Sequence, residues 1–196
     1  FPTRRSSDLT VEMAMVQSDS INLKVSGLVQ GARIVSENFT NDGAYEVTME
    51  IPMFGASGGL AAAVIEKPAV VEPIPEPDVT VTVKVEVKGG YTGLIIDCRG
   101  FRVQPVMSPV IKNANGKKIY GHENLDYDKV IEFGMASYAD NMSMATRAGS
   151  NPLIIKAVAV EDFNSNPVVS NEDANRILSE NKHSHFLEDT AVVFLY

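Results

Sequence analysis

The three histidines are the side chains best suited to metal binding or proton transfer. His183 and His185 stand two positions apart, and such a pair shares one face if it lies on a strand. A zinc site takes at least three protein ligands, and neither a cysteine nor a clear third ligand stands near this pair. We therefore place His183 and His185 in a polar loop after the last helix, interpret His122 as a loop residue after a Tyr-Gly turn, and predict no metal site.

The single cysteine, Cys98, lies between Asp97 and Arg99 at the end of an apolar run. One cysteine excludes an intrachain disulfide. A reactive thiol requires a nearby His or Lys and partial exposure, whereas the adjacent Asp97 carboxylate raises a thiol pKa. We interpret Cys98 as a small buried hydrophobe near a strand end.

Asp97, Arg99 and Arg147 are the remaining candidates for chemistry. A buried Asp97 needs a hydrogen-bond or charge partner, and Arg147, just before Gly149-Ser150-Asn151, could supply one. Acid–base catalysis needs a second positioned group, and the spacing identifies none. We favour a structural role for Asp97. A ligand-binding or enzymatic cleft that uses Asp97, Arg99 and Arg147 is the alternative.

Glycine-rich and serine motifs carry no further chemistry. Residues 55–59 (Gly-Ala-Ser-Gly-Gly) follow a predicted strand, but they lack the lysine of a phosphate loop and do not match the dinucleotide pattern. We interpret this stretch as a flexible loop. The sequence therefore predicts no catalytic residue, no cofactor site and no enzyme activity.

The elements that precede a proline-rich stretch form a small helix-plus-hairpin pattern. Apolar residues at helical spacing predict a helix over 19–30 that ends at Gly31. A strand over 32–38, an Asn-Asp-Gly turn and a return strand over 45–51 predict a β-hairpin. Apolar and polar residues alternate in the return strand, which predicts one buried sheet face. That face is lined by Tyr45, Val47, Met49 and Ile51, and the acidic face with Glu46 and Glu50 is predicted to be solvated.

The proline density of residues 66–78 predicts an extended connector, since proline suits neither a helix interior nor a sheet ladder. The segment 55–65 before it reads as a short helix or a mobile loop. Beyond it, the alternating valines of 79–88 predict the clearest strand of the chain. Further predicted strands are 91–98, 106–112, 117–120, 152–160 and 191–196; predicted helices are 126–139 and 170–181, the latter capped by Ser170.

These elements define an α+β fold class in two segments. Residues 1–9 resemble translated adapter sequence, and we predict that they are an artefactual or disordered leader. A truncated α/β unit covers 10–65, the connector covers 66–78, and a mixed α/β domain with two helices covers 79–196. The chain has 196 residues and a formal net charge of −8, which disfavours nucleic acid as a partner.

Two stretches resemble a known family of bacterial envelope proteins. The first runs from Val25 to Met53, and the second comprises Tyr91–Gly100, Met107–Lys112 and Ile119–Gly121. Together they are similar to the FlgP/FlgT-like family, which includes small outer-membrane lipoproteins. The resemblance implies export, a location in the periplasm or outer membrane, no enzyme activity, and assembly into rings or discs around the flagellar motor. It also implies that the membrane is reached only through an N-terminal lipid anchor, which this chain lacks.

We therefore predict a non-enzymatic structural subunit of the bacterial cell envelope that associates with itself. Its partners would be further copies and other envelope or flagellar proteins. The truncated first unit is too small to bury much surface by itself, and an open sheet edge invites pairing with another chain. Besides the enzymatic alternative, a peptide-binding module that works by strand addition, with strand 79–88 exposed, stays open.

Overall fold

The computed structural model describes residues 19–55, 58–78 and 87–196. The chain folds into two compact units. The smaller unit ends at Lys67 and includes residues 131–133; the larger unit comprises residues 68–130 and 134–196. The content of both helices and strands confirms the predicted α+β class. None of the helices in the described ranges combines the length and the apolar character needed to cross a membrane.

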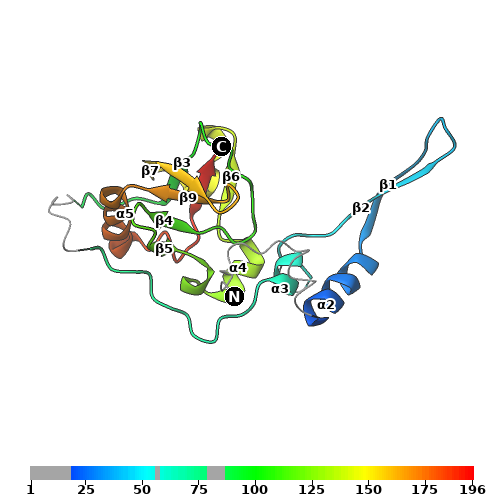
Figure 1. The fold of residues 1–196 in the computed structure, drawn as a ribbon, viewed down its shortest axis with the longest axis horizontal. Coiled ribbons are helices and arrows are strands. Elements are labelled where there is room, and N and C mark those ends of the chain that lie inside the picture. The colour runs from blue at the N-terminus through cyan, green and yellow to red at the C-terminus, as the bar shows by residue number, and fades with distance from the viewer. Residues whose placement is uncertain (1–18, 56–57, 79–86) are drawn as a thin grey trace. The chain divides into compact units, whose positions relative to one another are not determined.

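In the residues that the structure describes, the smaller unit contains one helix, one hairpin and one short helix (Figure 1). Helix α2 spans Asp19–Gln30 and ends at Gly31, whose backbone N–H donates to Gly27 O and Leu28 O, as predicted. Strands β1 (Arg33–Phe39) and β2 (Tyr45–Glu50) pair antiparallel, with a register shift between Ile34 and Ser36. The predicted helix and hairpin are therefore confirmed.

The predicted burial of one hairpin face is wrong. All residues of β1 and β2 are exposed, including Tyr45, Val47 and Met49. The two strands form a sheet of their own, with no third strand beside them in the described chain. Alternation predicted correctly which side chains share a face. It could not predict that the described residues of the smaller unit leave that face exposed.

The glycine-rich stretch leads into helix α3 (Leu60–Val64), which selects the short-helix alternative for this region. Gly59 lies where a Cβ atom would come within 2.6 Å of the Phe54 backbone, so only glycine fits this close turn. Ala61, Ala63 and Val64 of α3 are buried. The close packing of this turn explains why residue 59 is a glycine.

The described connector residues form neither helix nor strand, as predicted. From residue 68 onward they belong to the larger unit and bond to it. Glu72 N–H donates to Glu123 O, and Asp78 exchanges two hydrogen bonds with the Asn175 side chain. The predicted strand 79–88 lies outside the described residues except for its last two positions, 87 and 88, which are not in a strand. The domain boundaries proposed from the sequence stay a prediction.

A four-stranded parallel sheet forms the centre of the larger unit, in the order β6-β10-β3-β7 (Figure 1). Its strands are β3 (Gly93–Asp97), β6 (Ser137–Ala139), β7 (Pro152–Lys156) and β10 (Val192–Leu195). The two inner strands β3 and β10 are almost entirely buried, which explains why their sequences are continuous apolar runs rather than alternating ones.

A second, mixed sheet has the order β5-β4-β9-β8. Its strands are β4 (Ile111–Asn113), β5 (Lys118–Tyr120), β8 (Ala159–Glu161) and β9 (Asn166–Val169). The predicted strand 152–160 is in fact two strands, because the chain leaves the first sheet at Ala157 and joins the second at Val158. Strands β6 and β9 were missed, since three or four residues carry too little periodicity to identify.

Two α-helices and three 3₁₀ helices connect the strands. Helix α5 (Asn171–Ser184) begins at Ser170, whose hydroxyl accepts a hydrogen bond from Asp173 N–H, as predicted. Helix α4 (Tyr127–Phe133) ends at Gly134, which has a φ of 75°. The predicted helix 126–139 is therefore wrong in its second half, from residue 134 onward. The 3₁₀ helices are η2 (His122–Asn124), η3 (Met142–Met144) and η4 (Thr146–Ala148).

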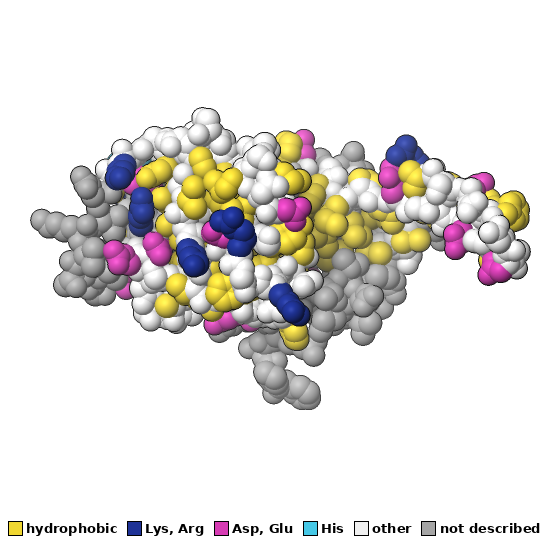
Figure 2. Space-filling model, turned by 90° about the horizontal axis from the view of Figure 1, so that it is seen from above, with side chains coloured by type: hydrophobic (Ala, Val, Ile, Leu, Met, Phe, Trp, Pro, Cys, Tyr) yellow, Lys and Arg dark blue, Asp and Glu magenta, His cyan; other side chains and the backbone are white. Residues whose placement is uncertain are grey.

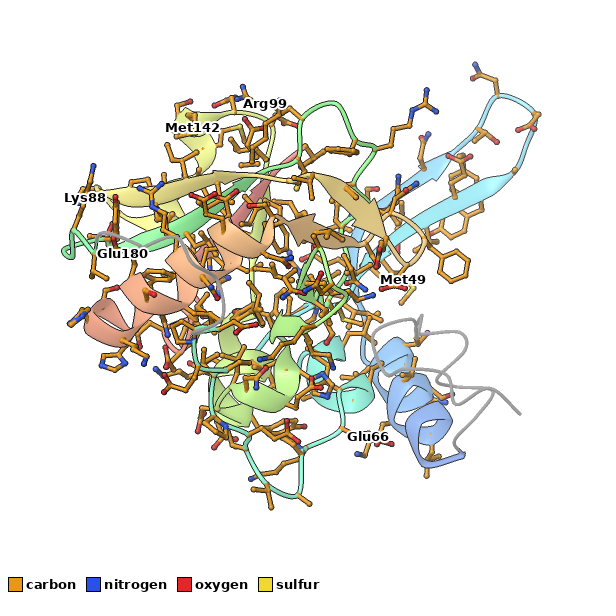
Figure 3. The ribbon with its side chains drawn as sticks, turned by 60° about the vertical axis from the view of Figure 1, so that its left-hand side comes forward. Met49, Glu66, Lys88, Arg99, Met142 and Glu180 are labelled. Carbon is orange, nitrogen blue, oxygen red and sulfur yellow. The ribbon has the colours of Figure 1, made fainter. Side chains whose placement is uncertain are left out.

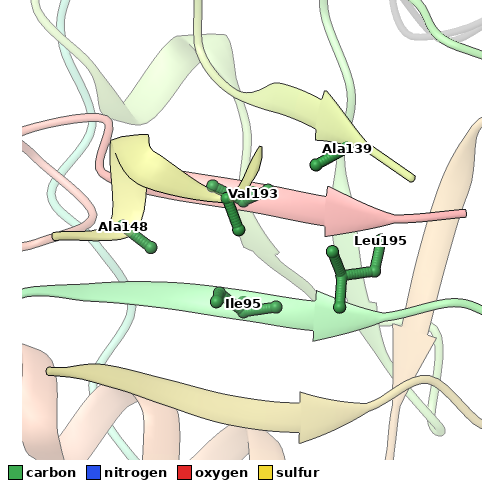
Figure 4. Close-up of a cluster of buried hydrophobic side chains, with 6 residues drawn as sticks. Ile95, Ala139, Ala148, Val193 and Leu195 are labelled. Carbon is green, nitrogen blue, oxygen red and sulfur yellow. The ribbon is translucent and has the colours of Figure 1, made fainter. Parts of the chain in front are cut away.

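A cluster of small and aliphatic side chains fills the space between the central strands and the 3₁₀ segments (Figure 4). It consists of Ile95, Ala139, Ala145, Ala148, Val193 and Leu195. The chain approaches itself closely at Gly93, where a Cβ atom would lie 2.5 Å from the Ala148 backbone and 2.6 Å from Ala191 O. Gly93 therefore sets the distance between β3 and η4.

We predict that Gly93→Ala destabilises the protein by at least about 2 kcal/mol, because backbone atoms on two sides must move to admit one methyl group. Thermal unfolding followed by circular dichroism measures the change. Gly27→Ala is the control, since a Cβ at Gly27 meets open space within a helix. Equal melting temperatures for Gly93→Ala and the parent would contradict the close packing at β3.

Candidate functional site

Asp97 and Arg99 form a closed pair at the carboxyl end of β3. Asp97 Oδ1 accepts hydrogen bonds from Arg99 N (3.1 Å) and Nε (2.9 Å), and Oδ2 accepts one from Nη2 (2.6 Å). The Arg99 guanidinium holds the pKa of Asp97 below its usual range, with a smaller contribution from the charge of Lys156. Asp97 is thus an ionised carboxylate that fixes the turn after β3, in keeping with the structural role favoured from the sequence.

Arg147 lies at the opposite end of β3. Its Nε donates to Thr190 O and its Nη2 donates to Gly134 O and Thr190 Oγ1, at 2.5–2.7 Å. The following residue, Ala148, packs against Gly93 at the amino end of the strand. The predicted pairing of Arg147 with Asp97 is therefore wrong, because a strand five residues long separates the two side chains. The three residues of the alternative cleft do not converge.

Cys98 is completely buried, as predicted for a small hydrophobe near a strand end. Burial, with a smaller contribution from the negative charge of Asp97, raises the pKa of its thiol to about 12. The thiol is consequently protonated at neutral pH and cannot act as a nucleophile, because the thiolate is the reactive form.

The histidines occupy positions that differ from the predicted loops. His183 lies in the last turn of α5 and His185 caps its end with a left-handed backbone (φ 53°), so the prediction of a loop after the helix is wrong. Residues two apart on a helix point in different directions, so these rings do not share a face. Over the part of the chain that the structure describes, no three His, Cys, Asp or Glu side chains gather in a way that could hold a metal ion.

His122 has two polar neighbours that the sequence did not reveal. Its Nδ1 lies 3.4 Å from Ser108 Oγ and 3.3 Å from Glu123 Oε2. A serine–histidine–acid relay uses the two ring nitrogens separately, one for the serine and one for the acid. Here both neighbours meet the same nitrogen, so the group lacks the geometry of that relay. Burial raises the pKa of Glu123, but the hydrogen bond from Lys118, a backbone hydrogen bond and the charges of Lys118 and His122 together lower it by more.

A strained turn between β8 and β9 is the feature of the larger unit that sequence reasoning missed. Asp162, Phe163 and Asn164 have φ values of 51°, 58° and 62°, a left-handed conformation that is unusual for phenylalanine. The Phe163 ring is 85% exposed. The Asp-Phe-Asn-Ser-Asn string could have indicated a turn with positive φ, because Asp and Asn tolerate this conformation.

Lys112 forms ion pairs with two residues of this turn. Its side chain is only 5% exposed, and its Nζ pairs with the carboxylates of Asp162 and Glu161. Burial lowers the pKa of Lys112, but the hydrogen bonds from the ammonium to these two carboxylates raise it by more, so the lysine stays charged. The Asn166 side chain also donates to Asp162, at 2.8 Å. The buried ammonium of Lys112 therefore fixes the position of the turn through its two partly exposed carboxylate partners.

The smaller unit presents the remaining candidate, an apolar face on the hairpin. Directly opposite residues in an antiparallel pair share a face, and the register pairs Ile34 with Met49 and Phe39 with Tyr45. The Phe39 and Tyr45 rings lie 4.8 Å apart. Hydrophobic and acidic side chains both reach the surface along the hairpin at the right of Figure 2. The apolar ones are gathered on one face and are not covered by the described residues of the smaller unit.

The larger unit defines the class of this protein: an α+β domain of two four-stranded sheets whose polar side chains fix turns and helix ends. The chain belongs to the family described as Treponema pallidum Tp0624, second domain, whose model matches residues 93–196. The match begins at β3 and covers every element up to β10. No curated protein matches the chain. The resemblance to the FlgP/FlgT-like family is a finer assignment and stays a prediction.

We predict that Cys98 in the folded protein resists alkylation by iodoacetamide at pH 8, since its thiol is buried and has a pKa of about 12. Addition of denaturant should make it react at the rate of a free cysteine. Mass spectrometry after timed quenching counts the modified fraction. Rapid modification under native conditions would show that the end of β3 opens to solvent.

We further predict that Phe163→Gly stabilises the protein by about 0.5–1 kcal/mol, because glycine adopts positive φ without steric cost and the exposed ring buries little surface. Phe163→Ala is the matched control. It also removes the ring but keeps a Cβ, so its stability should stay near that of the parent. Urea unfolding measures both variants, and an equal gain for both would mean that the ring, not the backbone, is the source of strain.

Proposed function

We propose that this chain is a non-enzymatic structural subunit of a bacterial cell envelope, and that it associates with copies of itself. The observation that carries the proposal is the apolar hairpin face of the smaller unit. Tyr45, Val47 and Met49 alternate with polar residues as in a strand with one buried face, yet they are 41–51% exposed. A contiguous apolar patch on a polar protein is typical of an interaction site.

The polar side chains of the larger unit support a structural role. Asp97 and Arg99 bond to each other, and Arg147 donates to the backbone oxygens of Thr190 and Gly134. Buried Glu180 accepts hydrogen bonds from the backbone N–H groups of Lys88 and Gly89, both at 2.8 Å (Figure 3). These groups are used to hold backbone in place. Catalysis instead needs groups directed at a common point where substrate binds.

Two kinds of likeness support a location in the envelope. The matching family is named after a bacterial protein. The residues Val25–Met53, Tyr91–Gly100, Met107–Lys112 and Ile119–Gly121 resemble FlgP/FlgT-like envelope proteins. We place the protein in the periplasm or at the outer membrane on this basis. Its membership of a ring or disc at the flagellar motor is the most specific part of the proposal. Fluorescent tagging of the full-length gene product in its host would separate foci at flagellar bases from uniform envelope labelling.

We predict that the intact chain forms oligomers in solution whose fraction rises with concentration. Sedimentation velocity from about 1 to 100 μM covers the range of dissociation constants typical of reversible assembly. The average mass should increase across this range. A monomer of 21.2 kDa at the highest concentration would overturn the proposal of self-association.

A further inference from the structure

The hairpin of the smaller unit is a ribbon with two chemically different faces. One face carries the pairs Ile34–Met49 and Phe39–Tyr45, with Val47 between them. The five side chains are 41–75% exposed. The opposite face carries the pairs Arg33–Glu50, Ser36–Thr48 and Asn38–Glu46, all polar. An isolated two-stranded ribbon is marginally stable in water, so a partner that covers the apolar face would also stabilise the ribbon.

The apolar face contains one charged residue, Glu37, which lies opposite Val47. Its carboxylate raises the pKa of the Tyr45 hydroxyl. The other members of the face are apolar apart from that hydroxyl. Such a face offers little to a partner that would recognise it by charge.

The size of the face indicates what can cover it. Five side chains of this kind, about half exposed, present roughly 500 Å² of apolar surface. Two such faces in contact would bury on the order of 1,000 Å², which is the lower limit for a specific protein–protein interface. An identical ribbon supplies a matching apolar stripe of the same length and keeps both polar faces in water.

We propose that the occupant of this face is the same hairpin of a second copy, stacked apolar face on apolar face. The inference rests on the proposed self-association and names its contact. Stacked sheets lie about 10 Å apart, so the two ribbons would form a small two-layer structure with side chains interdigitated between them. A contact between identical faces is two-fold symmetric, so Val47 near the middle of the ribbon meets, or lies close to, its counterpart.

Val47→Glu tests the proposal, with Thr48→Glu as a matched control. Val47 and Thr48 are neighbours on β2, both are β-branched, and they point to opposite faces. The same new residue therefore has the same strand propensity but places its carboxylate inside the contact in one variant and in water in the other. We expect Val47→Glu to raise the dissociation constant at least about 100-fold and Thr48→Glu to change it less than about three-fold.

Three outcomes decide between the proposals. If the parent chain is monomeric, both the proposed self-association and this contact are wrong. If the parent associates and Val47→Glu associates equally well, the protein assembles through another surface and only the hairpin contact is wrong. If both variants dissociate alike, the effect is not specific to the apolar face, and the contact is again wrong.

Thiol cross-linking gives a second measurement that does not depend on weakening the interface. Sheets about 10 Å apart hold two facing cysteines too far apart for a direct disulfide, so a short bis-maleimide is the probe. Val47→Cys should give a covalent dimer with this reagent, whereas Thr48→Cys should remain monomeric on a denaturing gel. The native Cys98 is completely buried and does not compete. A cross-linked dimer from Thr48→Cys but none from Val47→Cys would place the contact on the polar face and overturn the proposal.

Discussion

The burial of strand β3 between β7 and β10 is the constraint on which the larger unit depends. Leu94, Ile95 and Ile96 are essentially without exposure, so both faces of the strand must be covered and both of its edges paired. One face requires the close approach of η4, which Gly93 and Ala148 permit because neither carries a large side chain. Parallel strands also require long crossovers, and those crossovers contain the second sheet and both helices of this unit.

The same constraint explains where the polar residues are and what they do. A strand buried on both faces leaves polar groups only at its ends, and the backbone there needs partners. Asp97 closes the turn at one end with Arg99, while Arg147 binds backbone oxygens of Thr190 and Gly134 near the other. Glu180 and Asn175 of α5 bond to the backbone at Lys88, Gly89 and Asp78 in the same manner. These side chains bond to backbone groups at separate places in the fold.

The smaller unit, in contrast to the buried central sheet of the larger unit, leaves much of its apolar surface exposed. Its α2 and α3 helices bury only a few side chains, among them Val25, Ala61 and Val64. The hairpin extends as a two-stranded sheet with Ile34, Phe39, Tyr45, Val47 and Met49 exposed. A unit of this kind gains stability when another surface is added to it. This is the physical reason for linking its shape to assembly.

The sequence by itself determined the features that depend on local pattern: the helix at 19–30, the hairpin turn at 41–43, the capped helix that begins after Ser170, and the burial of Cys98. Local spacing suffices there because capping, turn geometry and periodicity involve residues a few positions apart. Only the tertiary structure decided which strands are neighbours, that 152–160 is divided between two sheets, and that Asp97 and Arg147 stand at opposite ends of one strand. It also decided that the described residues of the smaller unit leave the alternating strand 45–50 exposed, because alternation records which residues share a face and not what lies against them.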